Sequence, residues 1–484
     1  MKELTELLRD ILCEELAWSG APGAMMAVVH GEETAFVTEG FRDREKRLPV
    51  TPDTLYVIAS CSKSMTTAML GRLVDEGILG WDVPVREYAP DLVLKDPASA
   101  GMTLRDMLLH RTGLADHDGL WPDPEGRAAL ARRLRYVDPN LAFREKRQYN
   151  NVIYAMTAYV AECATGRSYD DLMREYLFRP LGMERTFTRH ADFLTDADSA
   201  EPYYYKNGTV RRQARWNMDP AVAAAAIATD AVDAAKWLRF NISGGFGPDG
   251  TRLLSENSWN QIHRGGIECI EDPRKDFLSF SGYGFGWWEG TYRGRRVYKH
   301  TGKINGFSSL EIFMPDAGIG CFTAVDLHCP ADHLYYRASY TAFDYLLGIR
   351  DGGREWARVY RTDDPISSKE SGVCDYDYMP ARTKTPAAAA FPAAAYAGEY
   401  RDDGYGSLRI TEKDGRLFWE RLIYSGPLDP WNGETFRAEE FWEDVKNITM
   451  PFTFTAEAGE ARPSAVTLPI EAMTAPVTFR RISR

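Results

Sequence analysis

Apolar residues recur at three- and four-residue spacing from the start of the chain. Positions 4, 7, 8, 11, 12 and 16 form one apolar stripe with acidic residues opposite, which predicts an amphipathic helix. Two short apolar runs, 24–29 and 34–38, flank a turn at His30 and Gly31 and predict a pair of strands. A second helical pattern starts near residue 60 and ends at Gly77.

Helical spacing then dominates from about residue 80 to residue 270, most clearly in 103–109, 151–163, 168–177 and 230–240. Strand patterns return in 282–288, 296–300, 308–313 and 320–325, and a helix is expected over 334–347. Strands on both sides of a helical middle predict one discontinuous sheet. We therefore expect an α+β domain over residues 1–350, with a helical insertion at about 80–270.

The rest of the chain has a different pattern. Residues 351–390 combine a charged stretch, a serine-rich stretch and an alanine run between prolines, which predicts a linker. Over residues 391–484, apolar and polar positions alternate and glycine turns separate the alternating runs, which predicts a small all-β barrel. The alternating apolar pairs are Leu408/Ile410, Leu417/Trp419, Phe452/Phe454, Val466/Leu468 and Val477/Phe479.

Composition narrows the class of protein. The 484 residues, 44% hydrophobic and 26% charged, are too many for one compact core. A net charge of -12 without a Lys- and Arg-rich cluster excludes a nucleic-acid surface. The sequence has neither a run of roughly 18 apolar residues nor the features of a secretory signal, so no membrane span or export is expected. Its seven scattered cysteines form no CxxC pair, which favours reduced thiols and a cytoplasmic location.

A serine and a lysine three positions apart, Ser60 and Lys63, stand at the start of the second helical pattern. Residues three apart on a helix share a face, so the lysine amine can reach the serine hydroxyl. A serine hydroxyl is a weak nucleophile at neutral pH and needs a neighbour that takes its proton. Alone the pair is a weak signal, since a capping serine beside a solvated lysine has the same spacing.

Two further motifs follow in order along the chain. Tyr149-Asn150-Asn151 opens an apolar helical pattern, and His300-Thr301-Gly302 follows a strand pattern. An SxxK pair, an amide-bearing triplet and a KTG-like triplet, in this order, form the series of serine β-lactamases and penicillin-binding proteins. The predicted class is therefore a serine hydrolase.

Three more segments carry a resemblance: residues 103–114, which end in HRTGL, residues 178–183 with the sequence FRPLGM, and residues 283–287 with the sequence YGFGW. With the motifs above, they resemble the serine β-lactamase-like superfamily, in the branch of class C β-lactamases, D-alanyl-D-alanine carboxypeptidases and family VIII esterases (peptidase S12-like). The match spans about residues 5–350, and the carboxy-terminal part resembles the lipocalin-like barrel of several members. This resemblance implies a β-lactamase/transpeptidase-like fold, in which helices and a helical subdomain flank an antiparallel sheet.

The resemblance also implies roles for individual residues. Ser60 would form an acyl-enzyme, with either Lys63 or Tyr149 as the general base. The sequence leaves the choice between these two bases open, because an ammonium favours the phenolate whereas a desolvated amine can itself be the base. Asn151 would hydrogen-bond Lys63 and the substrate, and a helix cap is its alternative role.

The strand of the third motif would line the substrate site. The backbone N–H groups of Ser60 and Lys303 would form the oxyanion hole, and Thr301 and Gly302 would let the substrate lie close to the strand. His300 stands where the family has the lysine of its KTG triplet. Because histidine is largely neutral at pH 7, we expect weaker recognition of a free carboxylate.

A second departure from the family is the alanine run 223–226, which stands where glycines are usual and would crowd one wall of the site. Several aromatic residues are candidates for either an apolar acyl site or the core, with the core favoured. They are Trp121, Tyr203, Tyr204, Tyr205, Trp216 and Trp287.

The departure at His300 favours hydrolysis of a small ester or amide, including a peptide with a D-residue, whereas the alanine run indicates no particular substrate. The alternatives are β-lactamase or D,D-peptidase activity, and a catalytically weak penicillin-binding or assembly module. No cofactor or metal is expected, because the histidine and aspartate groups of the chain lack metal-ligand spacing. The expected partner is a small-molecule ester, amide or peptide, with no nucleic acid and no membrane, and a homo-oligomer is compatible with the sequence. The groups considered as metal ligands are His110, His117, Asp118, Asp326, His328, Asp332 and His333.

Overall fold

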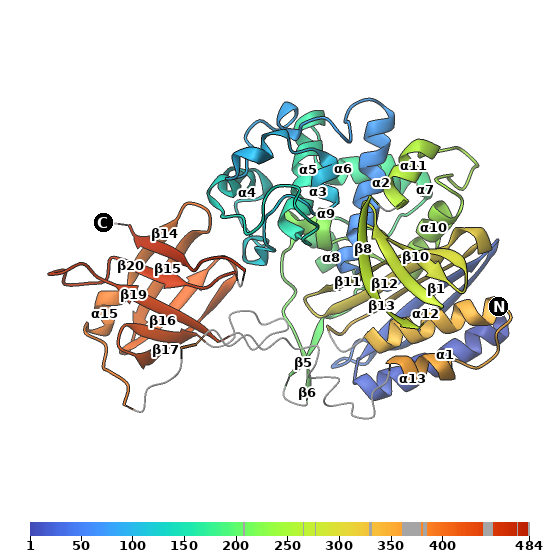
Figure 1. Cartoon of the computed structure of the whole chain (residues 1–484). Coiled ribbons are helices and arrows are strands. Elements are labelled where there is room, and N and C mark those ends of the chain that lie inside the picture. Colours follow the sequence, from blue (N-terminus) through green and yellow to red (C-terminus); the bar gives the residue numbers. More distant parts are fainter. Residues whose placement is uncertain are drawn as a thin grey trace.

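The computed structural model has two parts, which we call the sheet domain and the barrel (Figure 1). The sheet domain extends to residue 360, and the barrel follows it at the other end of the molecule. This α+β architecture with a carboxy-terminal barrel confirms the predicted fold class. The structure describes residues 1–206, 209–264, 266–275, 277–328, 332–360, 379–380, 385–438, 449–471 and 473–482.

The sheet of the first part is discontinuous in sequence, as expected. Strand β1 (Gly23–His30) pairs antiparallel with β2 (Glu33–Asp43) on one side and with β13 (Ile319–Val325) on the other. In the described residues the order is β3-β2-β1-β13-β12-β11-β10-β9-β8. The remaining strands are β3 (Leu48–Pro49), β8 (Ile267–Lys275), β9 (Leu278–Tyr283), β10 (Trp288–Tyr292), β11 (Arg295–Ile304) and β12 (Phe307–Met314).

Alternate side chains of β1 enter two separate apolar cores. Ala24, Met26 and Val28 pack toward α1 (Lys2–Ser19), α12 (Asp332–Leu346) and α13 (Arg354–Tyr360). Met25, Ala27 and Val29 pack in the other core, with α2 (Ser62–Asp75) and α10 (Ala231–Ile242). Figure 1 shows these two helix groups on opposite faces of the sheet. Burial on both faces explains why β1 is a continuous apolar run.

The helical insertion covers the end of α2 and forms most of the upper part of Figure 1. Two short strand pairs interrupt it, β4 (Tyr56–Val57) with β7 (Ala228–Thr229) and β5 (Tyr203–Lys206) with β6 (Thr209–Arg212). Its helices are α3 (Leu104–Leu108), α4 (Arg127–Arg133), α5 (Asn151–Thr165), α6 (Tyr169–Met173), α7 (Arg179–Leu181), α8 (His190–Thr195), α9 (Val222–Ala225) and α11 (Glu256–His263).

The single strand expected over residues 282–288 is wrong. Strand β9 ends at Tyr283, β10 begins at Trp288, and the residues between them form a tight turn. The N–H of Gly284 donates to the Trp287 carbonyl (2.7 Å), and Gly286 has a φ of +81°. Glycine adopts this left-handed conformation at little cost, so the two glycines make a turn inside an aromatic-rich run.

The barrel is closed by eight antiparallel strands, among the described residues. Of the alternating positions that the sequence marked, Leu408, Ile410, Leu417, Trp419, Phe452, Phe454, Val466, Leu468 and Phe479 are buried, and Val477 is partly buried. Most of the predicted linker, 361–378 and 381–384, lies outside the described residues, and its first part forms α13. The barrel consists of α15 (Ala393–Tyr396), β14 (Gly398–Asp402), β15 (Gly406–Lys413), β16 (Arg416–Arg421), β17 (Tyr424–Asn432), β18 (Thr435–Ala438), β19 (Met450–Thr455), β20 (Ala465–Leu468) and β21 (Val477–Arg481).

Candidate active site

Ser60 lies in a 3-10 turn, Ala59–Cys61, that leads directly into α2. Ala59 is fully buried and has a φ of +48°, a conformation that a residue with a side chain adopts only when its surroundings hold it. Part of that support comes from β11, since a Cβ on Gly302 would lie 2.3 Å from the Ile58 carbonyl oxygen. Glycine at this position thus lets β11 approach the backbone that carries Ser60.

The Ser60 hydroxyl is the meeting point of two polar side chains. Lys63 Nζ lies 3.1 Å from Ser60 Oγ, and Tyr149 donates its phenolic hydrogen to the same oxygen at 2.8 Å. Lys63 Nζ also donates to Asn151 Oδ1 (2.7 Å) and to the Ala224 carbonyl (2.9 Å). These two acceptors use both hydrogens of a neutral amine, so its lone pair is left for the Ser60 hydroxyl.

The pKa values of the two candidate bases move in opposite directions. Burial lowers the pKa of Lys63 to about 7, although the carboxylates of Asp116 and Asp118 oppose this change. Burial raises the pKa of Tyr149 well above its usual range. Near neutral pH the phenol therefore keeps its proton, whereas a large fraction of the amine is neutral.

A chain of four hydrogen bonds lies behind Tyr149. The Asn150 N–H donates to His110 Nδ1 (3.1 Å), which leaves His110 Nε2–H to donate to the Tyr283 hydroxyl (3.3 Å). Tyr283 then donates to His300 Nε2 (3.1 Å), and His300 Nδ1–H donates to the Thr301 carbonyl (2.7 Å). Each of these four hydrogen bonds has a donor and an acceptor when the imidazole rings of His110 and His300 are both neutral. The His110 ring also stacks on Tyr149, with 4.5 Å between centroids.

His300 is therefore a neutral, buried group. Burial, together with the nearby charge of Lys63, lowers the pKa of His300 to about 3. The positive charge of the family's KTG lysine is not reproduced at this position. Thr301 is partly buried beside it, and the Lys303 side chain is exposed.

Hydrogen bonds thus join Ser60, Lys63, Tyr149 and Asn151, whereas the His300 ring bonds to Tyr283 and to the Thr301 carbonyl. Asn150, not Asn151, caps α5, because its side chain accepts the Ile153 N–H. The alternative role of Asn151 as a helix cap is therefore wrong.

Two carboxyl groups adjoin Asn151: Asp116, which sequence reasoning missed, and Asp118, which it considered only as a metal ligand. Asn151 Nδ2 lies 3.4 Å from Asp116 Oδ1 and 3.3 Å from Asp118 Oδ1. Burial raises the pKa of Asp116, and burial together with the charge of Asp116 raises the pKa of Asp118 well above its usual range. In the sequence these two residues appear only as an Asp-x-Asp spacing. This spacing does not indicate a contact with Asn151, because the contact depends on how the loop packs beside α5.

A third missed residue is Arg147, two positions before Tyr149. Its guanidinium carbon lies 4.2 Å from the centre of the Tyr283 ring, 4.9 Å from that of Trp288 and 5.7 Å from that of Tyr149. It is half-buried, and within the described ranges it has no carboxylate partner. Arg147 is thus an uncompensated cation beside the candidate phenol.

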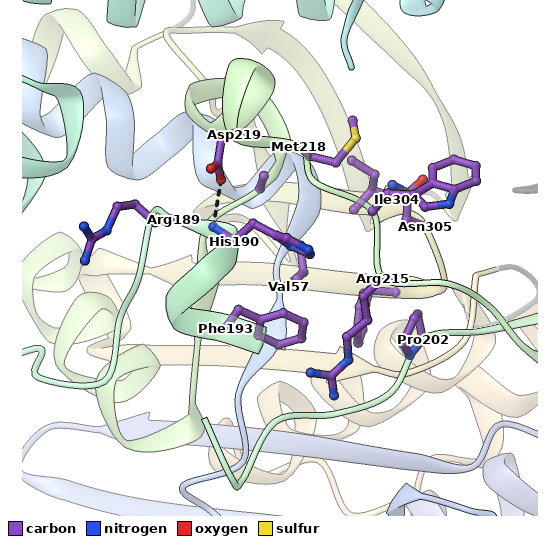
Figure 2. A pocket seen from close by; sticks show the side chains of 13 residues that line it. Val57, Arg189, His190, Phe193, Pro202, Arg215, Met218, Asp219, Ile304 and Asn305 are labelled. Carbon is purple, nitrogen blue, oxygen red and sulfur yellow. Dashed lines mark hydrogen bonds between the residues drawn. The ribbon is translucent and has the colours of Figure 1, made fainter. Parts of the chain in front are cut away.

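A pocket adjoins the Ser60 segment and the end of β11 (Figure 2). Val57 and Ile304 line it, each within three residues of Ser60 or Lys303. Ala226, from the predicted alanine wall, also lines the pocket, and so does Trp216, whereas Tyr203 and Trp287 belong to the core. Phe193 and Arg215 stack at 4.8 Å on another side of it, and Asp219 accepts the His190 N–H. The pocket combines apolar walls with charged groups.

The described parts of the chain contain neither a metal-binding cluster nor a membrane-spanning helix. No three His, Cys, Asp or Glu side chains gather there in a way that could hold a metal ion. None of the helices there has the length and apolar character needed to cross a bilayer.

A helix-flanked antiparallel sheet that holds a serine hydroxyl between an amine and a phenol defines a serine hydrolase. Comparison with known families makes this class more specific. The family model described as Beta-lactamase matches residues 8–329, and the chain belongs to this family. A second model, described as a domain of unknown function (DUF3471), matches residues 382–480 and so covers the barrel.

Relatives and solved structures agree with this family. The unguisins hydrolase ungD of Aspergillus violaceofuscus (strain CBS 115571) is 28% identical over 82% of this chain and 75% of its own length. The octameric penicillin-binding protein homologue from Pyrococcus abyssi has a TM-score of 0.63 at 20% identity, covering 98% of this chain and 99% of the other. The D-amino acid amidase from Ochrobactrum anthropi SV3 has a TM-score of 0.58 at 23% identity, covering 73% and 99%. At these identities the two structures show the shared fold.

Proposed function

We propose that the protein hydrolyses a small ester or amide, including a peptide with a D-residue, through an acyl-enzyme on Ser60. The observation that carries this proposal is the geometry at Ser60 Oγ, with Lys63 Nζ at 3.1 Å and the Tyr149 hydroxyl at 2.8 Å. The activity named for a similar protein, an unguisins hydrolase, supports a hydrolytic reaction.

In the proposed acylation, neutral Lys63 accepts the Ser60 proton while Oγ attacks the carbonyl carbon of the substrate. The backbone N–H groups of Ser60 and Lys303 stabilise the oxyanion, beside Thr301 and Gly302. Tyr149 passes its proton to the leaving amine or alcohol as the scissile bond breaks, and the Lys63 ammonium returns a proton to Tyr149. Water then attacks the acyl-enzyme and gives a proton to the same pair of side chains. The bond between the acyl carbon and Ser60 Oγ breaks, Oγ takes that proton back, and the acid is released.

This mechanism predicts a pH profile. Because Lys63 must be neutral to accept a proton and its pKa is about 7, the rate of acylation should rise with pH and level off above about pH 8. The measurement is the rate at which a fluorophosphonate labels Ser60 between pH 5 and 9. A rate that is flat through this range would exclude Lys63 as the base.

Ser60→Ala is the decisive variant. It should abolish labelling by a fluorophosphonate and by a penicillin, together with turnover of any substrate in a panel of nitrocefin, p-nitrophenyl esters and L- and D-amino acid amides. Labelling that survives in this variant would refute the nucleophile. Wild-type protein that no probe acylates would instead support the assembly-module alternative.

D,D-peptidase or β-lactamase activity is the second candidate function, and Arg147 favours it. A half-buried guanidinium without a carboxylate partner in the described residues can bind a carboxylate of the substrate, the task that His300 cannot perform. The test compares a peptide acid with its amide. Arg147→Met should lower kcat/KM at least tenfold for the acid only, whereas exposed Arg295→Met should change neither. Equal losses on acid and amide would remove this candidate.

A further inference from the structure

The loop of residues 116–119 lies between the Ser60 site and the barrel. On one side its two aspartates bond to the Asn151 amide nitrogen, and the Asn151 amide oxygen faces Lys63. At its centre His117 has a φ of +49°, a conformation that costs energy for a residue with a side chain. Such a loop keeps its shape only when neighbouring groups hold it.

The barrel supplies those groups. The Tyr405 hydroxyl lies 2.7 Å from His117 Nδ1, and Glu471 Oε2 accepts the His117 N–H at 2.9 Å. Arg421 Nη1 donates to the Gly119 carbonyl (3.0 Å), while its other nitrogens donate to the Tyr405 carbonyl. Arg421 is only 1% exposed, so these bonds form away from water, where they are strong. Figure 1 shows the barrel beside α4, on the side of the sheet domain that carries this loop.

We propose that the barrel contributes to the geometry of the active site. Its residues Tyr405, Arg421 and Glu471 are positioning residues that hold the 116–119 loop against Asn151. The two carboxyl groups attract the NH2 end of the Asn151 amide and so keep its oxygen toward Lys63. If the loop withdraws, the amide can rotate and Lys63 loses a partner. This inference rests on the proposed function of Lys63 as the base, and it assigns a role to a domain whose family model is described as one of unknown function.

The loop also sets the charge environment of Lys63. Asp116 and Asp118 raise the pKa of Lys63, so a loop that moves away should leave this pKa lower. The other titratable or charged groups that act on Lys63 or stack on it stay in place when only the barrel contact changes. These groups are Cys61, Arg147, Tyr149, Tyr154 and the neutral rings of His110 and His300.

Tyr405→Phe tests the inference by removing one hydroxyl from the full-length protein. The plateau rate of Ser60 labelling by a fluorophosphonate should fall about fivefold, the effect of losing one neutral hydrogen bond. The pH at which the labelling rate reaches half of its plateau should also be lower than in the wild type. The matched control is Tyr400→Phe, because the Tyr400 hydroxyl bonds to the Tyr396 carbonyl inside the barrel. In Tyr400→Phe, the fluorophosphonate should label Ser60 at the wild-type rate, even if the thermal midpoint of the protein falls.

Glu471 provides a second pair of variants. Glu471→Ala should reproduce the slower labelling, and Glu471→Gln should restore most of the rate, because the Gln oxygen still accepts the His117 N–H. Tyr405→Phe and Glu471→Ala proteins that label at the wild-type rate and pH would show that the contact serves stability alone. A wild type that is not labelled at all would refute the proposed function instead, so the two failures are distinct.

Discussion

Inside the sheet domain lie Lys63, His110, His300 and Glu311, all at most 3% exposed, whereas aromatic and aliphatic side chains fill the barrel. In the described part of the barrel, the buried charged side chains are Arg421 and Glu471, and both bond to the sheet domain. Burying a polar group costs free energy unless partners compensate it. The difference between the two interiors indicates that the chain bears this cost mainly in the sheet domain, which includes the groups around the Ser60 site.

Removing the buried amine should give the largest effect. Lys63→Met is expected to slow labelling of Ser60 by about 1000-fold, the range typical of a general base, while leaving the fold intact because methionine fills a similar volume. Labelling kinetics and circular dichroism check the two parts of this prediction. Exposed Lys413→Met in the barrel is the control. A rate within tenfold of wild type would point to Tyr149 as the base.

Truncating a buried side chain in the barrel core should lower the stability of the barrel. Phe452 is fully buried and packs on Trp419, with 5.5 Å between ring centroids. Phe452→Ala is expected to cost about 3–5 kcal/mol of barrel stability through lost contacts and a cavity. Urea unfolding followed by tryptophan fluorescence measures this loss. Phe452→Leu should cost much less, and equal losses from the two variants would argue against a tightly packed barrel core.

Titration of Glu311 should make the stability of the sheet domain depend on pH. The Trp237 indole donates to its carboxyl oxygen at 2.7 Å, and burial raises the pKa of Glu311 from its ordinary value near 4.5 to about 8. Between these values the folded state holds a proton that the unfolded state has lost, so stability should fall as pH rises. The slope is at most about 1.4 kcal/mol per pH unit. Glu311→Gln should flatten it.

Thermal midpoints at several pH values from 4.5 to 9 measure the effect of Glu311. Exposed Glu420→Gln in the barrel should keep the wild-type slope. If Glu311→Gln has the same slope as wild type, Glu311 is not the group that titrates.

The smallest effect is expected on the outside of the barrel. The hydroxyls of Thr467 and Thr478 lie 2.9 Å apart across two strands, in an exposed position. Because water replaces an exposed hydrogen bond, Thr478→Val should change the free energy of unfolding by less than about 0.5 kcal/mol and leave labelling unchanged. A larger change, measured by urea unfolding, would mean that the barrel surface also contributes to stability.

Sequence patterns predicted the parts of the molecule that depend on local order along the chain. The alternation at Leu408 and Ile410 indicated the barrel, and the three-residue spacing of Ser60 and Lys63 indicated their contact. The turn at 284–287 was missed because aromatic residues around Gly284 and Gly286 have the composition of a strand. The cytoplasmic location and the domain boundaries stay predictions.

The rest of the candidate site depends on contacts between distant segments. The barrel residues Tyr405, Arg421 and Glu471 lie about 290 to 350 positions beyond the loop that they hold, and no spacing rule connects them. Arg147 looks like an ordinary surface arginine until the 267–292 strands place Tyr283 and Trp288 against it. The neutral state of His300 likewise depends on burial, which the sequence does not specify.

The pairing of β1 with β13 sets the order in which the protein can become active during synthesis. Ala24 pairs with Val325, so the first strand to leave the ribosome waits for about 300 further residues before its second partner exists. The strand that supports the Ser60 turn, β11, is made almost as late. Until then the growing chain carries Ser60 without the strand that supports its turn, and β1 without its second partner.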